Sequence, residues 1–445
     1  MKFEEFLKKF KLKEGDHIEI KTGGIKQKGT IIPSNNDQNV VLKLDSGYNF
    51  SVNASKIISA EKISEGKKVT KPPIRILQKN TALPTISMLL IGGTISSRVD
   101  YKTGAVTVSY NPEDILSMFP ELEKIANFKA KLISQMFSED MRFVHHQIMA
   151  KAIQDEIAKG GIKGIILPHG TDTMGYTAAM LSFMIENPPI PIILVGSQRS
   201  TDRGSTDAAM NLICVAEFIA KTDYAGIGIC MHKTSEDKEC AILPPCKTRK
   251  LHTSRRDAFR PVNAGPIATI DYKTLKIEFN QKNYQKFDSS KKTVFKTNVE
   301  EKVALVKTHP NFSAEQLKVF LDNKYKGLVI EGTGLGQMPV GVPNPEAKPN
   351  QKNMEMIRQL TKNGCVVVMT SQCIFGKVQM HVYSAAVDLV NAGVIAGEDM
   401  LPETAFVKLA WLLGNYKAEE AKELVGKNLR GEISERTGYE EEFVE

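Results

Sequence analysis

Three clusters of small polar residues, each directly after a short apolar run, hold the side chains of this chain that could do chemistry. They are GGTISS at 92–97, HGTDT at 169–173 and GSQ at 196–198. Glycines before a threonine allow a turn that exposes the threonine hydroxyl. Because this hydroxyl is a weak nucleophile at its own pKa, nucleophilic chemistry here requires a base or a neighbouring cation.

The spacing of the first cluster excludes two common nucleotide-binding loops. GGTISS has no lysine followed by serine or threonine after its glycines, as a phosphate-binding P-loop has. It also lacks the G-x-G-x-x-G spacing of a dinucleotide site. We therefore expect no nucleotide site at this turn.

The elements around these clusters predict an α/β fold with a parallel sheet. Short apolar runs, typical of buried strands, alternate with helical patterns of hydrophobic residues. The expected strands are 86–91, 164–167, 190–195 and 225–231, and the expected helices are 113–127, 146–159, 175–185 and 205–220. In open α/β sheets ligands bind beyond the carboxyl ends of the strands, and the three clusters follow such ends.

The sequence before and after this α/β block forms further expected domains and connecting segments. Short alternating runs in the first segment, after a helical pattern at 3–10, predict a small all-β barrel-like module. A second α/β block follows a Lys- and Asn-rich connector at 271–297. We expect a module at 1–70, a linker at 71–84, a larger α/β domain at 85–295, a smaller one at 302–416 and a solvated acidic helical tail at 417–445.

Composition fits a globular cytoplasmic protein. Of 445 residues, 42% are hydrophobic, and no apolar run approaches the roughly 18 residues that a membrane helix needs. The six cysteines are scattered without a C-x-x-C pair, so we expect reduced thiols and no structural zinc. The net charge of +8 permits a polyanionic partner but does not require one.

Two motifs together resemble the bacterial-type L-asparaginase family: GGTISS and HGTDTM, at the separation they have here. The segment RKLHTSRRDAF (249–259) resembles the family's catalytic-lysine segment, while TSQC (370–373) and the glycine-threonine-glycine at 332–334 resemble its second domain. The front segments EGDHIEI and KLDSGYNFSV, with EDMLPETAFVKLAWLLG, resemble more closely the GatD family of archaeal glutamyl-tRNA(Gln) amidotransferases. This resemblance implies an asparaginase-like two-domain parallel-sheet core, preceded by the small all-β barrel-like domain.

The resemblance also implies a function. Such a chain is an amidase that releases ammonia from glutamine, or asparagine, for a partner protein, GatE, which amidates glutamate charged on tRNA(Gln). The complex acts as a carbon–nitrogen ligase in protein biosynthesis. ATP and Mg²⁺ belong to the chemistry of GatE, and no cofactor or metal is expected on this chain. A homodimer core within a heterotetramer is implied.

Site residues are implied by the same match. Thr94 is the candidate first nucleophile, and Tyr101 matches a mobile-loop tyrosine that would polarise it. Thr171, Asp172 and Lys250 form a second group, in which Asp172 holds Lys250 and a desolvated Lys250 acts as base toward Thr171. Which threonine attacks first stays open.

The segment QMFSEDM matches the family's substrate-clamping Ser-Gln-Asp segment. Ser138 could donate to the substrate's α-carboxylate, and the carboxylates of Glu139 and Asp140 suit its α-ammonium group. Glu139 departs from the asparaginase glutamine. Peptide N–H groups near Thr94 and Thr171 are candidate oxyanion donors.

Several other residues have a structural interpretation. His169 is expected to be structural, because Lys250 already supplies a base. The pair His145–His146 is not expected to bind metal, since neighbours on a helix face different ways. Trp411 lies among apolar residues at helical spacing and is expected in the core. Residues 200–203, with Asp207 and Asn211, flank the end of the third expected strand and are expected to shape its loop.

Two other functions remain open from the sequence. One is a stand-alone cytoplasmic L-asparaginase with an appended barrel. The other is a non-catalytic RNA-binding or scaffold protein that uses the module and the positive charge. The module has thirteen lysines against nine acidic residues over 1–70, an excess too small to assign tRNA binding to it.

Overall fold

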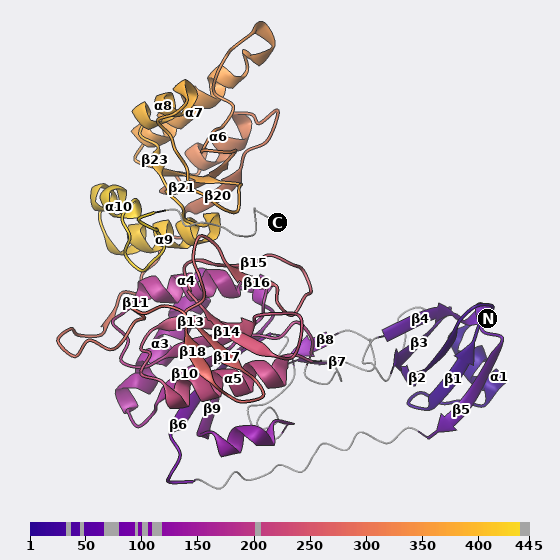
Figure 1. Cartoon of the computed structure of the whole chain (residues 1–445). Helices are drawn as coiled ribbons and strands as arrows, with labels where there is room; N and C mark the ends of the chain where they lie inside the picture. The colour runs from indigo at the N-terminus through magenta and orange to yellow at the C-terminus, as the bar shows by residue number, and fades with distance from the viewer. Residues whose placement is uncertain are drawn as a thin grey trace.

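The computed structural model describes residues 1–32, 37–44, 49–65, 80–93, 97–99, 106–108, 118–200 and 206–436. Figure 1 shows an N-terminal β module, a larger α/β domain and a smaller α/β domain, in chain order. None of the described helices is both long and apolar enough to cross a membrane.

The N-terminal module is an antiparallel five-stranded sheet in the order β4-β3-β2-β1-β5, with helix α1 packed against it. Alternate residues of its strands point inward, as the period of two predicts, so Ile18, Ile20 and Leu42 are buried with Phe6 of α1. Its elements are α1 (Phe3–Phe10), β1 (His17–Lys21), β2 (Lys26–Ile32), β3 (Asn39–Leu44), β4 (Asn49–Asn53) and β5 (Ser59–Ser64), with a 3₁₀ turn at Ala54–Lys56.

The larger domain is built on an eight-stranded mixed sheet in the order β18-β17-β14-β13-β12-β10-β6-β9. The strands from β9 to β13 run parallel, and β14, β17 and β18 extend the sheet as antiparallel neighbours. The expected parallel sheet is therefore present, and three antiparallel strands that the sequence analysis does not predict extend it at one edge. The strands are β6 (Thr85–Gly92), β9 (Asn127–Met136), β10 (Gly164–Pro168), β12 (Ile192–Val195), β13 (Ile227–His232), β14 (Glu239–Leu243), β17 (Ala268–Asp271) and β18 (Ile277–Phe279).

Helices cover both faces of this sheet, so alternate side chains of each central strand enter different cores. Ile165 and Leu167 face α3 (Phe143–Lys159) and α4 (Met174–Met184), whereas Ile166 faces α5 (Ala208–Lys221). Burial on both faces explains why these strands are continuous apolar runs in the sequence.

One helix prediction is wrong at its C-terminal end. The sequence pattern predicts a helix over 113–127, but the described part holds only a 3₁₀ turn (Pro120–Lys124), and Asn127 begins β9. The side chain of Asn127 also accepts the N–H of Asn80 at 2.8 Å, which ties the entry of the domain to the start of β9. The greater part of the expected linker lies outside the described residues.

The smaller domain has a parallel sheet in the order β20-β21-β22-β23, and it is joined to the larger domain by α9. Trp411 of α9 is buried as expected, stacks on Phe183 of α4 and donates its Nε1–H to the carbonyl of Lys296 at 2.8 Å. The elements are β20 (Val303–Lys307), α6 (Glu315–Asp322), β21 (Gly327–Gly332), a 3₁₀ turn (Pro345–Ala347), α7 (Asn350–Lys362), β22 (Val366–Ser371), α8 (Ser384–Asn391), β23 (Ile395–Ala396), α9 (Pro402–Asn415) and α10 (Ala418–Val425).

Three two-stranded pairs complete the described secondary structure. The expected connector at 271–297 contains β18, of the eight-stranded sheet, and β19, of one of these pairs. It therefore holds regular structure that its composition does not indicate. The pairs are β7 (Ser97–Val99) with β8 (Val106–Val108), β11 (Ile185–Glu186) with β19 (Val294–Phe295), and β15 (Thr248–Lys250) with β16 (Phe259–Pro261).

Residues 418–425 are helical as expected, and many side chains of 418–436 are exposed, but the segment is packed against α9 and is not loose. Ala421 and Val425 of α10 are fully buried, and Glu432 lies beyond the helix in a closed ion pair with Lys408 of α9. Their Oε1 and Nζ atoms are 2.6 Å apart, and both side chains have 0% exposure. Residues 437–445 lie outside the described residues.

Candidate active site

The carboxyl ends of neighbouring parallel strands meet around one pocket of about 300 Å³. It lies beyond β6, β9, β10 and β12, the place where an open α/β sheet binds ligands. Its lining residues are Gly93, Phe137, Ser138, Glu139, Gly170, Thr171, Asp172, Gln198, Arg199 and Ser200.

The structure brings Thr171, Asp172 and Lys250 together. Nζ of Lys250 donates to Oγ1 of Thr171 at 2.8 Å and to Oδ1 of Asp172 at 2.8 Å. The β15–β16 pair positions the lysine, because its register places Lys250 opposite the buried ring of Phe259. The Thr171 hydroxyl is buried, while the carboxylate of Asp172 is 61% exposed. A cation that contacts both a hydroxyl and a carboxylate can polarise the hydroxyl and is itself held in place.

The predicted substrate-clamping segment forms the next wall. Residues Ser138–Asp140 are a 3₁₀ turn at the end of β9. Oγ of Ser138 accepts the N–H of Asp172 at 3.3 Å, and Oγ1 of Thr173 donates to the carbonyl of Ser138 at 2.8 Å. Ser138 and Glu139 line the pocket, whereas Asp140 is exposed in the same turn and is not among the lining residues.

Two glycines allow these segments to touch. At Gly93, where φ is +80°, a Cβ atom would lie 2.2 Å from the backbone nitrogen of Gly170. At Gly170, a Cβ would lie 2.6 Å from Oγ of Ser138. Any other residue at either position would separate the loops, so the site needs glycine at both.

Thr94 and Tyr101, the other candidate catalytic and loop residues, lie outside the described residues. Their assignments stay predictions. Gly93 lines the pocket directly before Thr94 in the sequence.

His169 is buried beside the pocket and is neutral. Its Nδ1 lies 2.6 Å from the carbonyl of Gly170, so this nitrogen carries the proton, and burial lowers the pKa of His169 to about 4. This bond leaves Nε2 as the unprotonated nitrogen, which is buried without a hydrogen-bond partner among the described residues. The structural interpretation of His169 stays a prediction.

The adjacent histidines on α3 have different partners. Nε2 of His146 lies 3.1 Å from Oγ1 of Thr177, and burial lowers the pKa of His146 to about 3. Nδ1 of His145 instead accepts the N–H of Arg142 at 2.9 Å. Across the described residues, no group of three or more His, Cys, Asp or Glu side chains could hold one metal ion.

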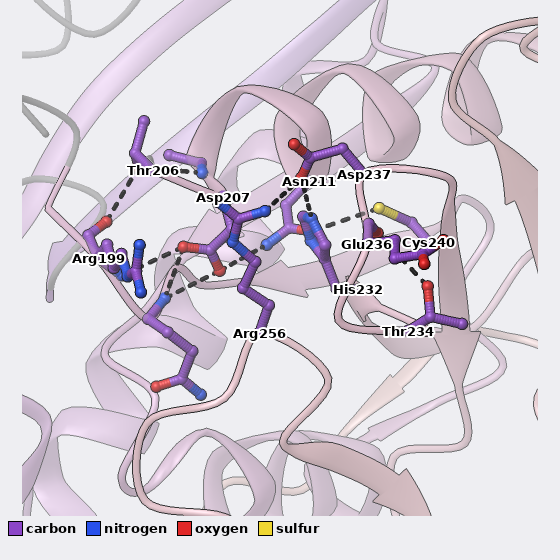
Figure 2. Close-up of polar contacts among 12 residues, drawn as sticks. Arg199, Thr206, Asp207, Asn211, His232, Thr234, Glu236, Asp237, Cys240 and Arg256 are labelled. Carbon is purple, nitrogen blue, oxygen red and sulfur yellow. Dashed lines mark hydrogen bonds and ion pairs between the residues drawn. The ribbon is translucent and has the colours of Figure 1, made fainter. Parts of the chain in front are cut away.

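Gln198, Arg199 and Ser200 line the pocket, and we call the segment 196–200 that carries them the pocket wall. The sequence singles out the cluster at 196–198 but does not give the contacts of its side chains. The backbone N–H groups of Gln198 and Arg199 donate to the carboxylate of Asp207 (Figure 2). Within the described structure, Nε2 of Gln198 and Oγ of Ser200 are buried without a hydrogen-bond partner. Unsatisfied polar groups beside a pocket are available to a bound polar ligand.

A second pocket, of about 370 Å³, lies between the larger domain and α9. Its lining includes Arg142, Phe143, Thr173 and Phe406, but none of the lysine-linked group. We therefore place the chemistry in the smaller pocket, where Thr171 and Asp172 are.

The fold and this pocket define an asparaginase-type two-domain α/β protein. The family model "Asparaginase, N-terminal" matches residues 85–285, and "Glutaminase/Asparaginase C-terminal domain" matches residues 302–424. The structure of an L-asparaginase from Thermococcus kodakarensis superposes with a TM-score of 0.69 at 27% identity, covering 79% of this chain and all of that one. An L-asparaginase I from Vibrio cholerae gives 0.68 at the same identity and coverage.

The N-terminal module narrows the family. Residues 12–63 match the model "GatD N-terminal domain". The D-subunit of the glutamyl-tRNA(Gln) amidotransferase of Methanococcus maripaludis is 44% identical over 96% of this chain and 99% of its own length. Its counterpart in Pyrococcus furiosus is 43% identical over 98% of both chains. The chain belongs to the GatD family of glutamyl-tRNA(Gln) amidotransferases.

Proposed function

We propose that this chain is the amidase component of a glutamyl-tRNA(Gln) amidotransferase, with threonine as its nucleophile. The observation that carries the chemistry is the contact of Lys250 with both Thr171 and Asp172 at 2.8 Å. Family membership over nearly the whole length supplies the biological setting.

The proposed reaction begins with Lys250 in its unprotonated form. The amine accepts the hydroxyl proton of Thr171, and the oxygen attacks the carboxamide carbon of glutamine or asparagine. The C–N bond breaks, the nitrogen takes the proton and leaves as ammonia, and water then hydrolyses the acyl–threonine ester. Backbone N–H groups near Thr94 and Thr171 are proposed to stabilise the oxyanion.

Thr94 and Tyr101 keep their proposed roles as the other nucleophile and its polarising residue. Ser138 is proposed to donate its hydroxyl to the substrate's α-carboxylate. Glu139, which lines the pocket, is proposed to face the α-ammonium group, and Asp140 is proposed to add negative charge from outside the lining.

The remaining assignments concern the assembly. Ammonia is proposed to pass to the partner protein GatE, which amidates glutamate on tRNA(Gln) and uses ATP and Mg²⁺, neither of which this chain is proposed to bind. A homodimer of this chain is the proposed core of a heterotetramer. The match at residues 12–63 favours this interpretation over a stand-alone asparaginase, because the L-asparaginase structures are covered in full by 79% of this chain.

The test is ammonia release from glutamine and from asparagine in three states. These are the chain alone, the chain with GatE, and the complex with glutamyl-tRNA(Gln), ATP and Mg²⁺. Strong stimulation in the third state, with amide appearing on tRNA-bound glutamate, is expected. Fast asparagine hydrolysis that partner and tRNA leave unchanged would instead identify a free asparaginase. The matched control is Thr171→Val, which should be inactive in all three states.

A further inference from the structure

The pocket wall at 196–200 is hydrogen-bonded to Asp207, the residue directly before α5. The N–H of Gln198 donates to both carboxylate oxygens of Asp207, at 3.0 and 2.9 Å, and the N–H of Arg199 donates to one of them at 3.1 Å (Figure 2). Asp207 is fully buried. A buried carboxylate is costly unless hydrogen bonds satisfy it, and here the wall itself provides them.

The local sequence gives Asp207 another task, which it does not perform. It is the N-cap residue of α5, a position where aspartate usually accepts an N–H of its own helix. Its side chain makes no such cap bond; Oγ1 of Thr206 accepts the N–H of Ala208 instead. The carboxylate is therefore directed to the wall at the expense of its usual local role.

Asn211, one turn further along α5, holds the other end of the wall. Its Nδ2 donates to the carbonyl of Gly196 at 3.0 Å. Gly196 in turn lies against the candidate nucleophile, because a Cβ atom there would be 2.9 Å from Cγ2 of Thr171. A shift of the wall would thus reach both the pocket lining and Thr171.

The orientation of Asn211 is fixed from behind by His232. With Nδ2 engaged as donor, Oδ1 accepts from Nδ1 of His232 at 2.7 Å and from Sγ of Cys240 at 3.3 Å. The histidine must therefore carry a proton on Nδ1. Its Nε2 lies 3.3 Å from Oδ1 of Asp237.

The last residue of this network is Arg256. Nη1 of Arg256 donates to the same oxygen of Asp237. Arg256 lies in the 249–259 segment, which also carries Lys250. A series of polar contacts therefore joins the pocket wall to the segment that supplies the lysine.

We propose that Asp207, Asn211 and His232 are positioning residues that hold the wall at 196–200 against the bound amino-acid amide. This inference rests on the proposed amidase function and adds residues to it. The wall would present Gln198 and Ser200 to the substrate, so its loosening weakens substrate binding more than it slows chemistry at Thr171.

The first test is Asp207→Asn in the full chain with GatE. One carboxylate oxygen becomes an N–H donor that faces two other donors, so we expect KM for the amide substrate to rise about tenfold, the effect of losing one charge-assisted hydrogen bond. We expect kcat to change much less. Asp223→Asn is the matched control, because Asp223 follows the other end of α5 and pairs with Lys286 at the surface. A folded Asp207→Asn protein with wild-type KM overturns the proposal.

A second pair of variants works even if Asp207→Asn fails to fold. His232→Asn keeps an N–H near the position of Nδ1 and should retain a KM close to wild type. His232→Gln places its amide near Nε2 instead, so it loses the bond to Asn211 and should raise KM. Equal KM values in the two variants contradict the positioning role.

Amide hydrogen exchange separates this inference from the proposed function. Exchange at Gln198 and Arg199 should be faster in Asp207→Asn, or in His232→Gln if that variant alone folds, and unchanged in Asp223→Asn, whether or not the enzyme is active. A wild-type chain that releases no ammonia would reject the proposed function. Unchanged exchange at these two amides would reject the positioning role of Asp207 and His232.

Discussion

At the scale of single residues, the site depends on one lysine that contacts two groups. Lys250 is 79 residues from Thr171 in sequence, yet Nζ lies 2.8 Å from its hydroxyl oxygen. Asp172 fixes the lysine from the other side at the same distance. Among the described residues, Lys250 is the basic group that contacts the hydroxyl of Thr171 directly.

We predict that Lys250→Ala lowers kcat for amide hydrolysis by about 10²–10⁴-fold, the usual contribution of a positioned base. Thr171→Val should be at least as damaging. Ammonia release per folded molecule is the measurement, and Lys276→Ala, which removes a lysine paired with Glu278 at the surface, is the control. Wild-type turnover in Lys250→Ala would reject its role.

The two buried histidines predict a pH dependence of stability. Burial lowers the pKa of His169 to about 4 and that of His146 to about 3, below the ordinary value of 6.5. As pH falls below about 6.5, the unfolded chain takes up protons at these positions and the folded chain does not, so the free energy of unfolding falls. This loss continues to about pH 4 for His169 and about pH 3 for His146.

Urea unfolding between pH 7 and pH 4 checks this prediction. His169→Asn, whose amide can still donate to the carbonyl of Gly170, should make the decline shallower by up to one proton. His146→Gln, whose amide can still reach Thr177, should do the same. A decline as steep as that of the wild type in both variants would contradict the assignment.

The sequence could predict Thr171, Asp172 and Lys250 because family motifs mark them. It could also place Asp207 at the loop after the third expected strand, but not its hydrogen-bond partners. Only the tertiary structure shows that the carboxylate turns to Gln198 and Arg199.

At the scale of elements, strands buried on both faces were predictable and edge strands were not. Strands β10, β12 and β13 are buried throughout and apolar except for His232 at the end of β13, so their runs stand out in the sequence. β9, with the sequence NFKAKLISQM, is half-exposed at the sheet edge and carries two lysines. No strand is predicted from the sequence over these residues, although β9 delivers the Ser138 turn to the pocket.

The helix α9 and the segment after α10 form one unit through Lys408 and Glu432. We predict that Glu432→Gln destabilises the protein by about 3–5 kcal/mol, because it leaves a buried ammonium without its counter-charge. The measurement is chemical unfolding in a double-mutant cycle. Lys408→Met with Glu432→Leu should recover most of the loss, since both charges are then removed. Additive losses in the double variant would contradict the coupling.

At the scale of the whole molecule, the two α/β domains share a hydrophobic core, whereas the N-terminal module has a separate one. The core that holds Trp411 draws residues from α3, α4 and α9 and from strands of both α/β domains, so these domains depend on each other. Among the described residues, the buried core of the N-terminal module is formed by residues of the module alone, from Phe3 to Ile57.

We therefore predict that residues 1–65 fold alone. The fragment should show a cooperative thermal transition by circular dichroism, although a domain of this size is only marginally stable. Phe6→Ala should abolish the transition, because truncating a buried phenylalanine costs about 3–5 kcal/mol. Lys9→Ala, at an exposed position of α1, should leave it intact. A fragment without a transition would show that the module needs the rest of the chain.

The Lys408–Glu432 pair also sets an order of events during synthesis. The ribosome adds Lys408 well before Glu432, so a nascent chain that already contains all of α9 still lacks the anion that neutralises the lysine. Until residue 432 emerges, burying α9 between the two α/β domains would bury an unpaired charge. We therefore expect docking of α9 to be completed late, and a chain interrupted before Glu432 to leave that surface open to proteases and chaperones.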